Sequence, residues 1–169
     1  MCPEGARHGD DALRGIRRRL REVVLAIPSD KGVYAVCFYL KEEARITSRT
    51  GRRLASVGPG LVLYVGSAGG PGGLRARLSR HLAGEHDGCW WHVDCISRAA
   101  DEVVFVYYKV GQHGTASEDA LSESLLSLPQ LRPLYGIGNT DSREPHTFIC
   151  SCVTPVVKAL RSLGGVVLT

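Results

Sequence analysis

Four side chains between residues 32 and 82 have types and spacing suited to chemistry on a phosphodiester. Tyr34 and Tyr64 each lie in a short apolar, β-branched stretch, and Arg77 and His81 follow four residues apart. Arginine stabilises negative charge on phosphate, and histidine exchanges protons near neutral pH. A core role, in which each tyrosine tethers its hydroxyl and Arg77 covers apolar surface, is the alternative interpretation.

Strands and helices predicted from hydrophobic periodicity would position these side chains. Residues 32–40, 61–66 and 102–110 are predicted strands, and residues 45–57 a hairpin that turns at Gly51. Amphipathic periodicity predicts helices over residues 11–27, 74–83 and 117–128, and a threonine followed by a proline starts another at 156–163. In the second helix Leu74, Leu78 and Leu82 form the buried stripe, and Arg77 and His81 lie about 40° apart along its edge.

The glycine-rich run at residues 66–73 leads into that second helix. It has neither the Gly-Lys-Ser/Thr ending of a P-loop nor the Gly-x-Gly-x-x-Gly spacing of a dinucleotide site. A glycine loop that opens a helix exposes backbone N–H groups at the positive end of the helix dipole. We therefore expect a phosphate to bind near Gly72 and Gly73.

Composition and charge favour a single globular domain that binds a polyanion. The chain has 169 residues, is 44% hydrophobic and has a net charge of +4. Residues 41–80 contain eight Lys/Arg against two Asp/Glu, whereas residues 81–169 contain six against ten. A local basic surface suits nucleic acid, with a solvated basic face as the alternative.

The chain ends and cysteines suggest a cytoplasmic protein. No apolar run is long enough to cross a membrane, and the first eleven residues lack an apolar signal region. The six cysteines are too sparse for a secreted disulfide scaffold, so most are expected to be buried thiols, although an intracellular disulfide remains an option.

Several motifs together resemble the GIY-YIG nuclease superfamily. They are Gly32-Val33-Tyr34, Tyr64-Val65-Gly66 and the Arg77–His81 helix. Trp91-His-Val-Asp94, the Gly136–Asp141 run and Pro145-His-Thr-Phe148 resemble, more closely, a poorly characterised, largely archaeal branch of that superfamily, a domain of unknown function. The resemblance spans roughly residues 30–150.

The resemblance implies an α+β fold, with a small three-stranded antiparallel sheet flanked by helices and an additional N-terminal helix. The expected organisation is an N-terminal helix over residues 1–29, the GIY-YIG-like domain over residues 30–152, and a C-terminal helix and tail over residues 153–169. The implied activity is metal-dependent hydrolysis of DNA, more than RNA, with structure selectivity in repair or recombination.

In the scheme that the resemblance implies, Tyr34 would orient or deprotonate the attacking water and Tyr64 would contact the scissile phosphate. Arg77 would stabilise charge and His81 would assist proton transfer. A tyrosine pKa near 10 must fall before the phenol can act as a base at neutral pH, so a metal-bound hydroxide is a competing assignment. The metal would be Mg²⁺ or Mn²⁺.

The carboxylate that would hold this metal is displaced from its expected position. Superfamily members carry a glutamate about nine residues before a proline, and with Pro129 as that proline the position is Ala120. Glu123 is the predicted substitute and Glu118 the alternative. If neither reaches the phosphate, the chain binds nucleic acid without cutting it.

The remaining candidates surround this centre. His92 and Asp94 would share one face of an extended segment, as a proton-handling or a purely structural pair. Zinc held by the histidines and cysteines between residues 81 and 95, with Cys150 and Cys152, would give an interaction domain, but no paired Cys-x-x-Cys modules occur. The residues predicted to contact phosphate or nucleic acid are Gly66, Gly72, Gly73, Arg75, Arg80, His92, Asp94, Asp141 and His146.

Overall fold

A computed structural model of the chain describes residues 23–84, 88–138 and 142–169. Its strands are β1 (Gly32–Leu40), β2 (Ala44–Thr47), β3 (Arg53–Val57), β4 (Gly60–Ala68), β5 (Glu102–Val110), β6 (Leu131–Leu134), β7 (Thr147–Cys150) and β8 (Val166–Leu168). Its helices are α2 (Gly73–Ala83), α3 (His92–Ala99), α4 (Thr115–Leu126) and α5 (Val153–Ser162). The fold is α+β, as predicted.

The main sheet is larger than the predicted three strands. Six strands lie in the order β6-β7-β4-β1-β5-β8, every adjacent pair is antiparallel, and β2 and β3 form a separate hairpin. The three predicted strands are β4, β1 and β5, in the middle of this order. The added strands contain only three or four residues each, too few to give an alternating pattern that sequence analysis can detect.

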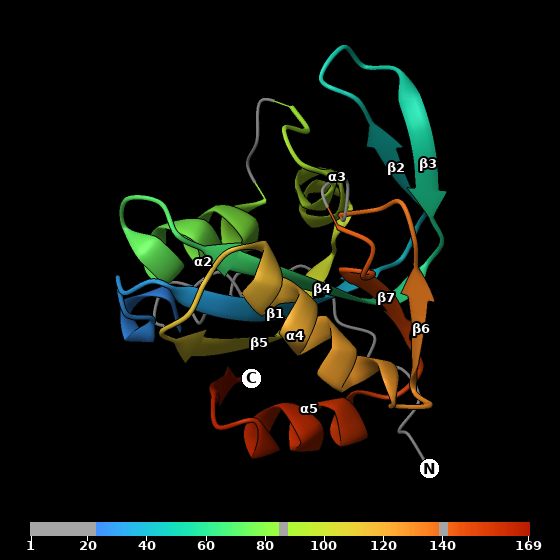
Figure 1. The fold of residues 1–169 in the computed structure, drawn as a ribbon. Coiled ribbons are helices and arrows are strands. Elements are labelled where there is room, and N and C mark those ends of the chain that lie inside the picture. The colour runs from blue at the N-terminus through green and yellow to red at the C-terminus, as the bar shows by residue number, and fades with distance from the viewer. Residues whose placement is uncertain (1–22, 85–87, 139–141) are drawn as a thin grey trace, which may run out of the picture.

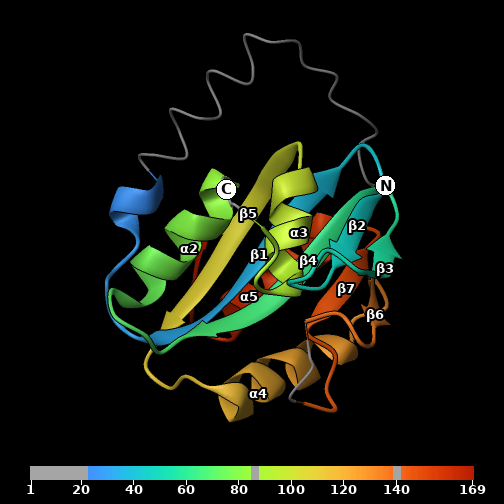
Figure 2. The same cartoon turned by 90° about the horizontal axis from the view of Figure 1, so that it is seen from above.

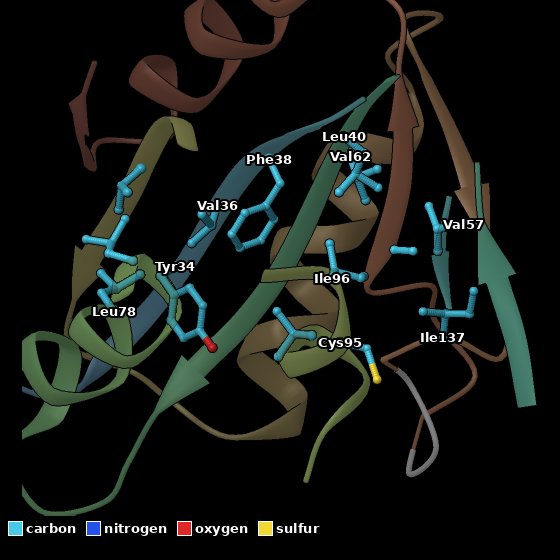
Figure 3. Packing of buried hydrophobic residues seen from close by; sticks show 14 of the residues in the cluster. Tyr34, Val36, Phe38, Leu40, Val57, Val62, Leu78, Cys95, Ile96 and Ile137 are labelled. Carbon is cyan, nitrogen blue, oxygen red and sulfur yellow. The ribbon is translucent and has the colours of Figure 1, made fainter. Parts of the chain in front are cut away.

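Helices cover both faces of the sheet, and each face has its own core. On one face, Tyr34, Val36 and Phe38 of β1 pack with leucines of α2 and with Ile96 of α3 (Figure 3). On the other face, the alternate residues of β1 pack against α4 and α5. Figure 1 shows α2 and α3 above the sheet and α5 below it, and Figure 2 looks down onto α2 and α3. Alternation along β1 therefore places Tyr34 on the α2 side.

The structure corrects one predicted segment and leaves another largely outside the described residues. Residues 92–99 form helix α3, so the extended segment predicted for His92 and Asp94 is wrong. Residues 23–26 are helical, and the rest of the predicted N-terminal helix lies outside the described residues. At the other end, α5 contributes Val156 and Leu160 to a core and β8 pairs with β5.

The cysteines only partly follow the prediction. Cys37 and Cys150 are buried free thiols, as expected, and burial is the first cause that raises the pKa of each thiol. Cys89 and Cys95 instead form a disulfide, because α3 brings them to a Cα–Cα distance of 5.2 Å.

None of the helices that the structure describes has the length and apolar character needed to span a bilayer.

Candidate active site

The centre of the site is a buried pair formed by a tyrosine and a histidine. The Tyr34 hydroxyl of β1 lies 2.8 Å from Nε2 of His81 on α2. Tyr34 is 2% and His81 1% exposed. The Tyr64 ring of β4 lies 6.3 Å from the Tyr34 ring and 6.1 Å from the His81 ring, measured between centroids. Three of the four residues predicted to do the chemistry therefore contact one another.

The environment of Tyr34 determines which proton chemistry it can perform. Burial raises its pKa well above 10, and the nearby Tyr64, Glu118 and Asp94 add to that effect, whereas the positive charge of Arg77 opposes it. The phenol therefore keeps its proton at neutral pH, and Tyr34 does not act as an anionic base. It can orient a water molecule, and His81 is the neighbour able to exchange a proton with it.

Two glycines allow the aromatic side chains to approach one another. A Cβ added to Gly66 would lie 2.5 Å from the Tyr34 hydroxyl oxygen, so only glycine fits beneath this side chain. A Cβ on Gly138 would lie 2.8 Å from the Tyr64 ring, and Gly138 has a φ of +84°. Gly66 thus lies within strand β4 and not in a turn. Its part in the site is to leave room for the Tyr34 side chain.

The sheet is notched beside this cluster. β7 pairs with β4 from Leu61 to Tyr64, and the last bond between them comes from the Val65 N–H to the His146 carbonyl. Beyond that point β4 continues to Ala68 without β7 beside it. Glu118, on helix α4 at the other face of the sheet, is among the charges that add to the raised pKa of Tyr34.

An acidic pair on α4 contacts a buried histidine at the end of the β4–β7 pairing, a place that we call the notch. His146 is completely buried, with its Nε2 2.8 Å from Oδ1 of Asp119 and its Nδ1 3.5 Å from Oε2 of Glu118. The same Nδ1 lies 3.2 Å from the Gly138 carbonyl oxygen. Burial opposes ionisation of Asp119, but hydrogen bonds from Ser142 and His146 outweigh it and lower the pKa of Asp119. His146 therefore links the acidic pair to the Gly138 loop.

Glu118, not Glu123, is the carboxylate that faces the cluster. Glu123 is exposed and lies five residues further along α4, about 140° around the helix from Glu118. Ala120 lines a separate cavity of about 460 Å³, together with Tyr107 and Lys109, on the other face of the sheet. The position of Glu118 therefore suits the predicted role of metal carboxylate, and the position of Glu123 does not.

Arg77 lies at the border between the cluster and the surface. Its guanidinium carbon lies 4.5 Å from the centroid of the Trp91 ring. Burial raises the pKa of Tyr34, and the charge of Arg77 partly opposes this rise. Stacking on an aromatic face leaves the in-plane N–H groups of a guanidinium available to an anion. Arg77 can therefore contact a phosphate placed next to Tyr34.

Asp94 and Arg80, both predicted to contact nucleic acid, form an ion pair with each other. Asp94 is completely buried and accepts hydrogen bonds from Arg80 at 2.8 and 3.3 Å. The same carboxylate accepts the backbone N–H groups of Trp90 and Trp91 at 3.0 Å. Asp94 therefore fixes the start of α3 rather than contacting a ligand.

His92 does not pair with Asp94 either. Its Nδ1 accepts the Gly138 N–H at 3.0 Å, and burial lowers its pKa. A neutral His92 thus holds the Gly138 loop against α3. Asp141, in the same predicted loop, lies outside the described residues.

The first N–H groups of α2, which the sequence predicts to bind a phosphate, have backbone carbonyls as acceptors. The N–H groups of Gly73, Leu74, Arg75 and Ala76 donate to the carbonyls of Gly70, Asp30, Pro28 and Gly72. The Arg75 side chain donates to the Ile27 carbonyl at 2.7 Å. The loop glycines let the chain pack closely, since a Cβ on Gly73 would overlap the Asp30 carbonyl oxygen. These four N–H groups are therefore not available to a phosphate.

Sequence reasoning missed Asp119 and Gly138. Acidic residues in the first turns of a helix are common because the helix dipole favours them, so Asp119 has no distinguishing signal in the sequence. The Gly136–Asp141 run stands out in the sequence, but nothing in its composition indicates that Gly138 packs on Tyr64. For the zinc alternative, two of the candidate ligands, Cys89 and Cys95, are joined to each other in a disulfide.

Comparison with known proteins gives one match. Residues 33–165 match the model of a family described as a domain of unknown function, DUF123. No curated protein and no solved structure shows significant similarity to the chain.

Proposed function

The chain belongs to the DUF123 family, a domain of unknown function. From its site, we propose that it is a metal-dependent endonuclease of the GIY-YIG type that hydrolyses phosphodiester bonds in DNA. The observation that carries this proposal is the contact of Tyr34, Tyr64 and His81, with Arg77 at its rim and Glu118 in the adjoining notch. The motif resemblance described above supports the same reading.

Each group in the cluster has a role suited to its surroundings. Arg77 binds the scissile phosphate and offsets the charge that develops on it during attack. Tyr34, which is protonated before the reaction, orients the attacking water, takes a proton from it and passes its own proton to Nε2 of His81. Tyr64, half-buried beside both, contacts the phosphate from β4.

Glu118 is the residue that would hold a divalent metal. Mg²⁺ typically binds through one or two carboxylates and keeps several of its waters, so a single glutamate in a polar notch fits it. Glu118 retains 18% of its side-chain exposure and its charge influences Tyr34. When bound, the metal would supply a Lewis acid that lowers the pKa of a coordinated water.

A second candidate is a DNA-binding module of the same fold without catalytic activity. Two observations favour it: burial raises the pKa of Tyr34, and the described residues hold no group of three or more His, Cys, Asp or Glu arranged for a metal. Both candidates share the basic surface of residues 41–80. They differ only in whether DNA is cut.

A cleavage assay distinguishes the two. Purified protein is incubated with labelled DNA, including branched and single-stranded forms, in Mg²⁺ or Mn²⁺ and in EDTA. The endonuclease proposal expects metal-dependent cleavage that Arg77→Ala reduces by about 100-fold or more, whereas Arg161→Ala, an exposed arginine on α5, leaves it unchanged. Binding without cleavage in any metal would establish the second candidate.

A further inference from the structure

Trp90 and Trp91, the only two tryptophans of the chain, lie on the surface next to the candidate site. Trp90 is 59% and Trp91 47% exposed. Tryptophan is usually well buried, because it has more apolar area to remove from water than other side chains. Two exposed tryptophans in succession therefore suggest a surface that binds a flat or apolar group.

Three features of the structure fix the backbone that carries these two side chains. The Cys89–Cys95 disulfide closes a loop around them, and Asp94 accepts both of their backbone N–H groups. Helix α3 begins at the next residue, His92. Their exposure is therefore a feature of a braced segment, which suits a preformed binding surface.

Arginines from two other elements surround the tryptophans. Arg49, in the turn between β2 and β3, lies 3.9 Å from the centroid of a Trp90 ring. Arg77 and Arg80 of α2 lie 4.5 and 4.9 Å from the Trp91 ring. In Figures 1 and 2, α3 lies between α2 and the β2–β3 hairpin, so positive charge approaches from both sides.

We propose that Trp90, Trp91, Arg49, Arg77 and Arg80 form a platform on which unpaired nucleobases stack, so that the substrate is DNA with a single-stranded segment beside the scissile phosphate. This inference rests on the proposed function and names its substrate class. Single-stranded nucleic acid binds characteristically to aromatic side chains set in a basic groove. Bases within a duplex already stack on their neighbours and offer no free face to a tryptophan.

Arg77 connects this platform to the candidate active site. It contacts the Trp91 ring, and its charge also acts on Tyr34. A strand whose phosphate binds Arg77 next to Tyr34 therefore has its neighbouring bases at Trp91. This continuity favours nucleic acid over a protein as the occupant of the platform.

Tryptophan fluorescence reports on the platform directly, because the chain has no other tryptophan. Wild-type protein in EDTA, which prevents metal-dependent cleavage, is titrated with a single-stranded oligonucleotide and with a blunt duplex of equal length at the same salt concentration. We expect strong quenching by the single strand and little by the duplex. In anisotropy titrations, Trp90→Ala and Trp91→Ala should each weaken single-strand binding by about 5- to 100-fold, since one stacked base contributes on the order of 1–3 kcal/mol.

Trp90→Phe and Trp91→Phe are the controls. Because they keep an aromatic face, they should retain most of the affinity for single strands. Thermal melts would check that each variant folds. Equal quenching by both DNA forms, no quenching by either, or alanine variants that bind single strands as well as wild type does would overturn the inference. Metal-dependent cleavage of duplex DNA alongside those results would leave the endonuclease proposal standing. Absence of cleavage in every metal, with single-strand quenching intact, would remove that proposal and keep the platform.

Discussion

The Tyr34 hydroxyl and Nε2 of His81 lie 2.8 Å apart with both side chains almost fully buried. Because burial raises the pKa of Tyr34, this pair is a protonated phenol beside an imidazole and not a phenolate poised to attack. The proton acceptor of this pair is therefore His81 and not Tyr34. It also explains why glycine is needed at position 66, where a Cβ would displace the hydroxyl.

Tyr34→Phe tests this pair. Removing the hydroxyl should lower the cleavage rate by about 100-fold or more, because the water loses its orienting group, while DNA affinity stays unchanged. Tyr39→Phe is the matched control, since Tyr39 lies on the same strand and is 38% exposed. Single-turnover cleavage and anisotropy measure the two quantities. A Tyr34→Phe enzyme as fast as wild type would show that the hydroxyl takes no part.

Gly138→Ala tests how the loop positions Tyr64. An alanine at position 136 or 138 must adopt a positive φ, which costs about 1–2 kcal/mol of stability. Only at position 138 does the new Cβ also meet the Tyr64 ring. Gly138→Ala should therefore lower the free energy of unfolding by about 1–3 kcal/mol more than Gly136→Ala and should also reduce cleavage. Denaturant unfolding of the two variants gives the difference. Equal losses would mean that Tyr64 is not held by this loop.

His92 gives the fold a dependence on pH in the acidic range. Its pKa lies below the unfolded value of 6.5, so below that pH the unfolded chain takes up a proton that the folded chain resists. Its contribution to stability is thus present at neutral pH and is lost as the pH falls through this range.

His92→Asn isolates that contribution among the six histidines of the chain, because the asparagine oxygen can accept the Gly138 N–H without titrating. The melting temperature, measured from about pH 7.5 to about pH 5.5, should fall more for wild type than for His92→Asn. Parallel curves for the two proteins would rule out His92 as the titrating group.

The central strands and the helix with Arg77 and His81 were predictable because each is a local pattern. The third strand, residues 102–110, is predicted with the bounds that the structure shows. Leu74, Leu78 and Leu82 set the orientation of α2 from sequence spacing alone, and all three are buried.

What the sequence did not reveal depends on contacts between distant residues. The choice between Glu118 and Glu123 depends on where α4 crosses the notch beside β4, and helix periodicity says nothing about that crossing. The Leu74 and Arg75 N–H groups at the start of α2 are occupied by the carbonyls of residues 30 and 28, more than forty residues before them, so a local glycine motif cannot show that these donors are taken. Likewise, residues 92–99 are short and mixed in composition, and the disulfide and Asp94 stabilise their helix.

The most direct test of the central claim is DNA cleavage by Glu118→Gln and Glu123→Gln in Mg²⁺, with DNA affinity measured in parallel. The two residues lie on the same helix, but only Glu118 faces His146 and acts on Tyr34. We predict that Glu118→Gln binds DNA normally and loses cleavage by about 100-fold or more, whereas Glu123→Gln cleaves like wild type. Wild-type cleavage by Glu118→Gln would contradict the account.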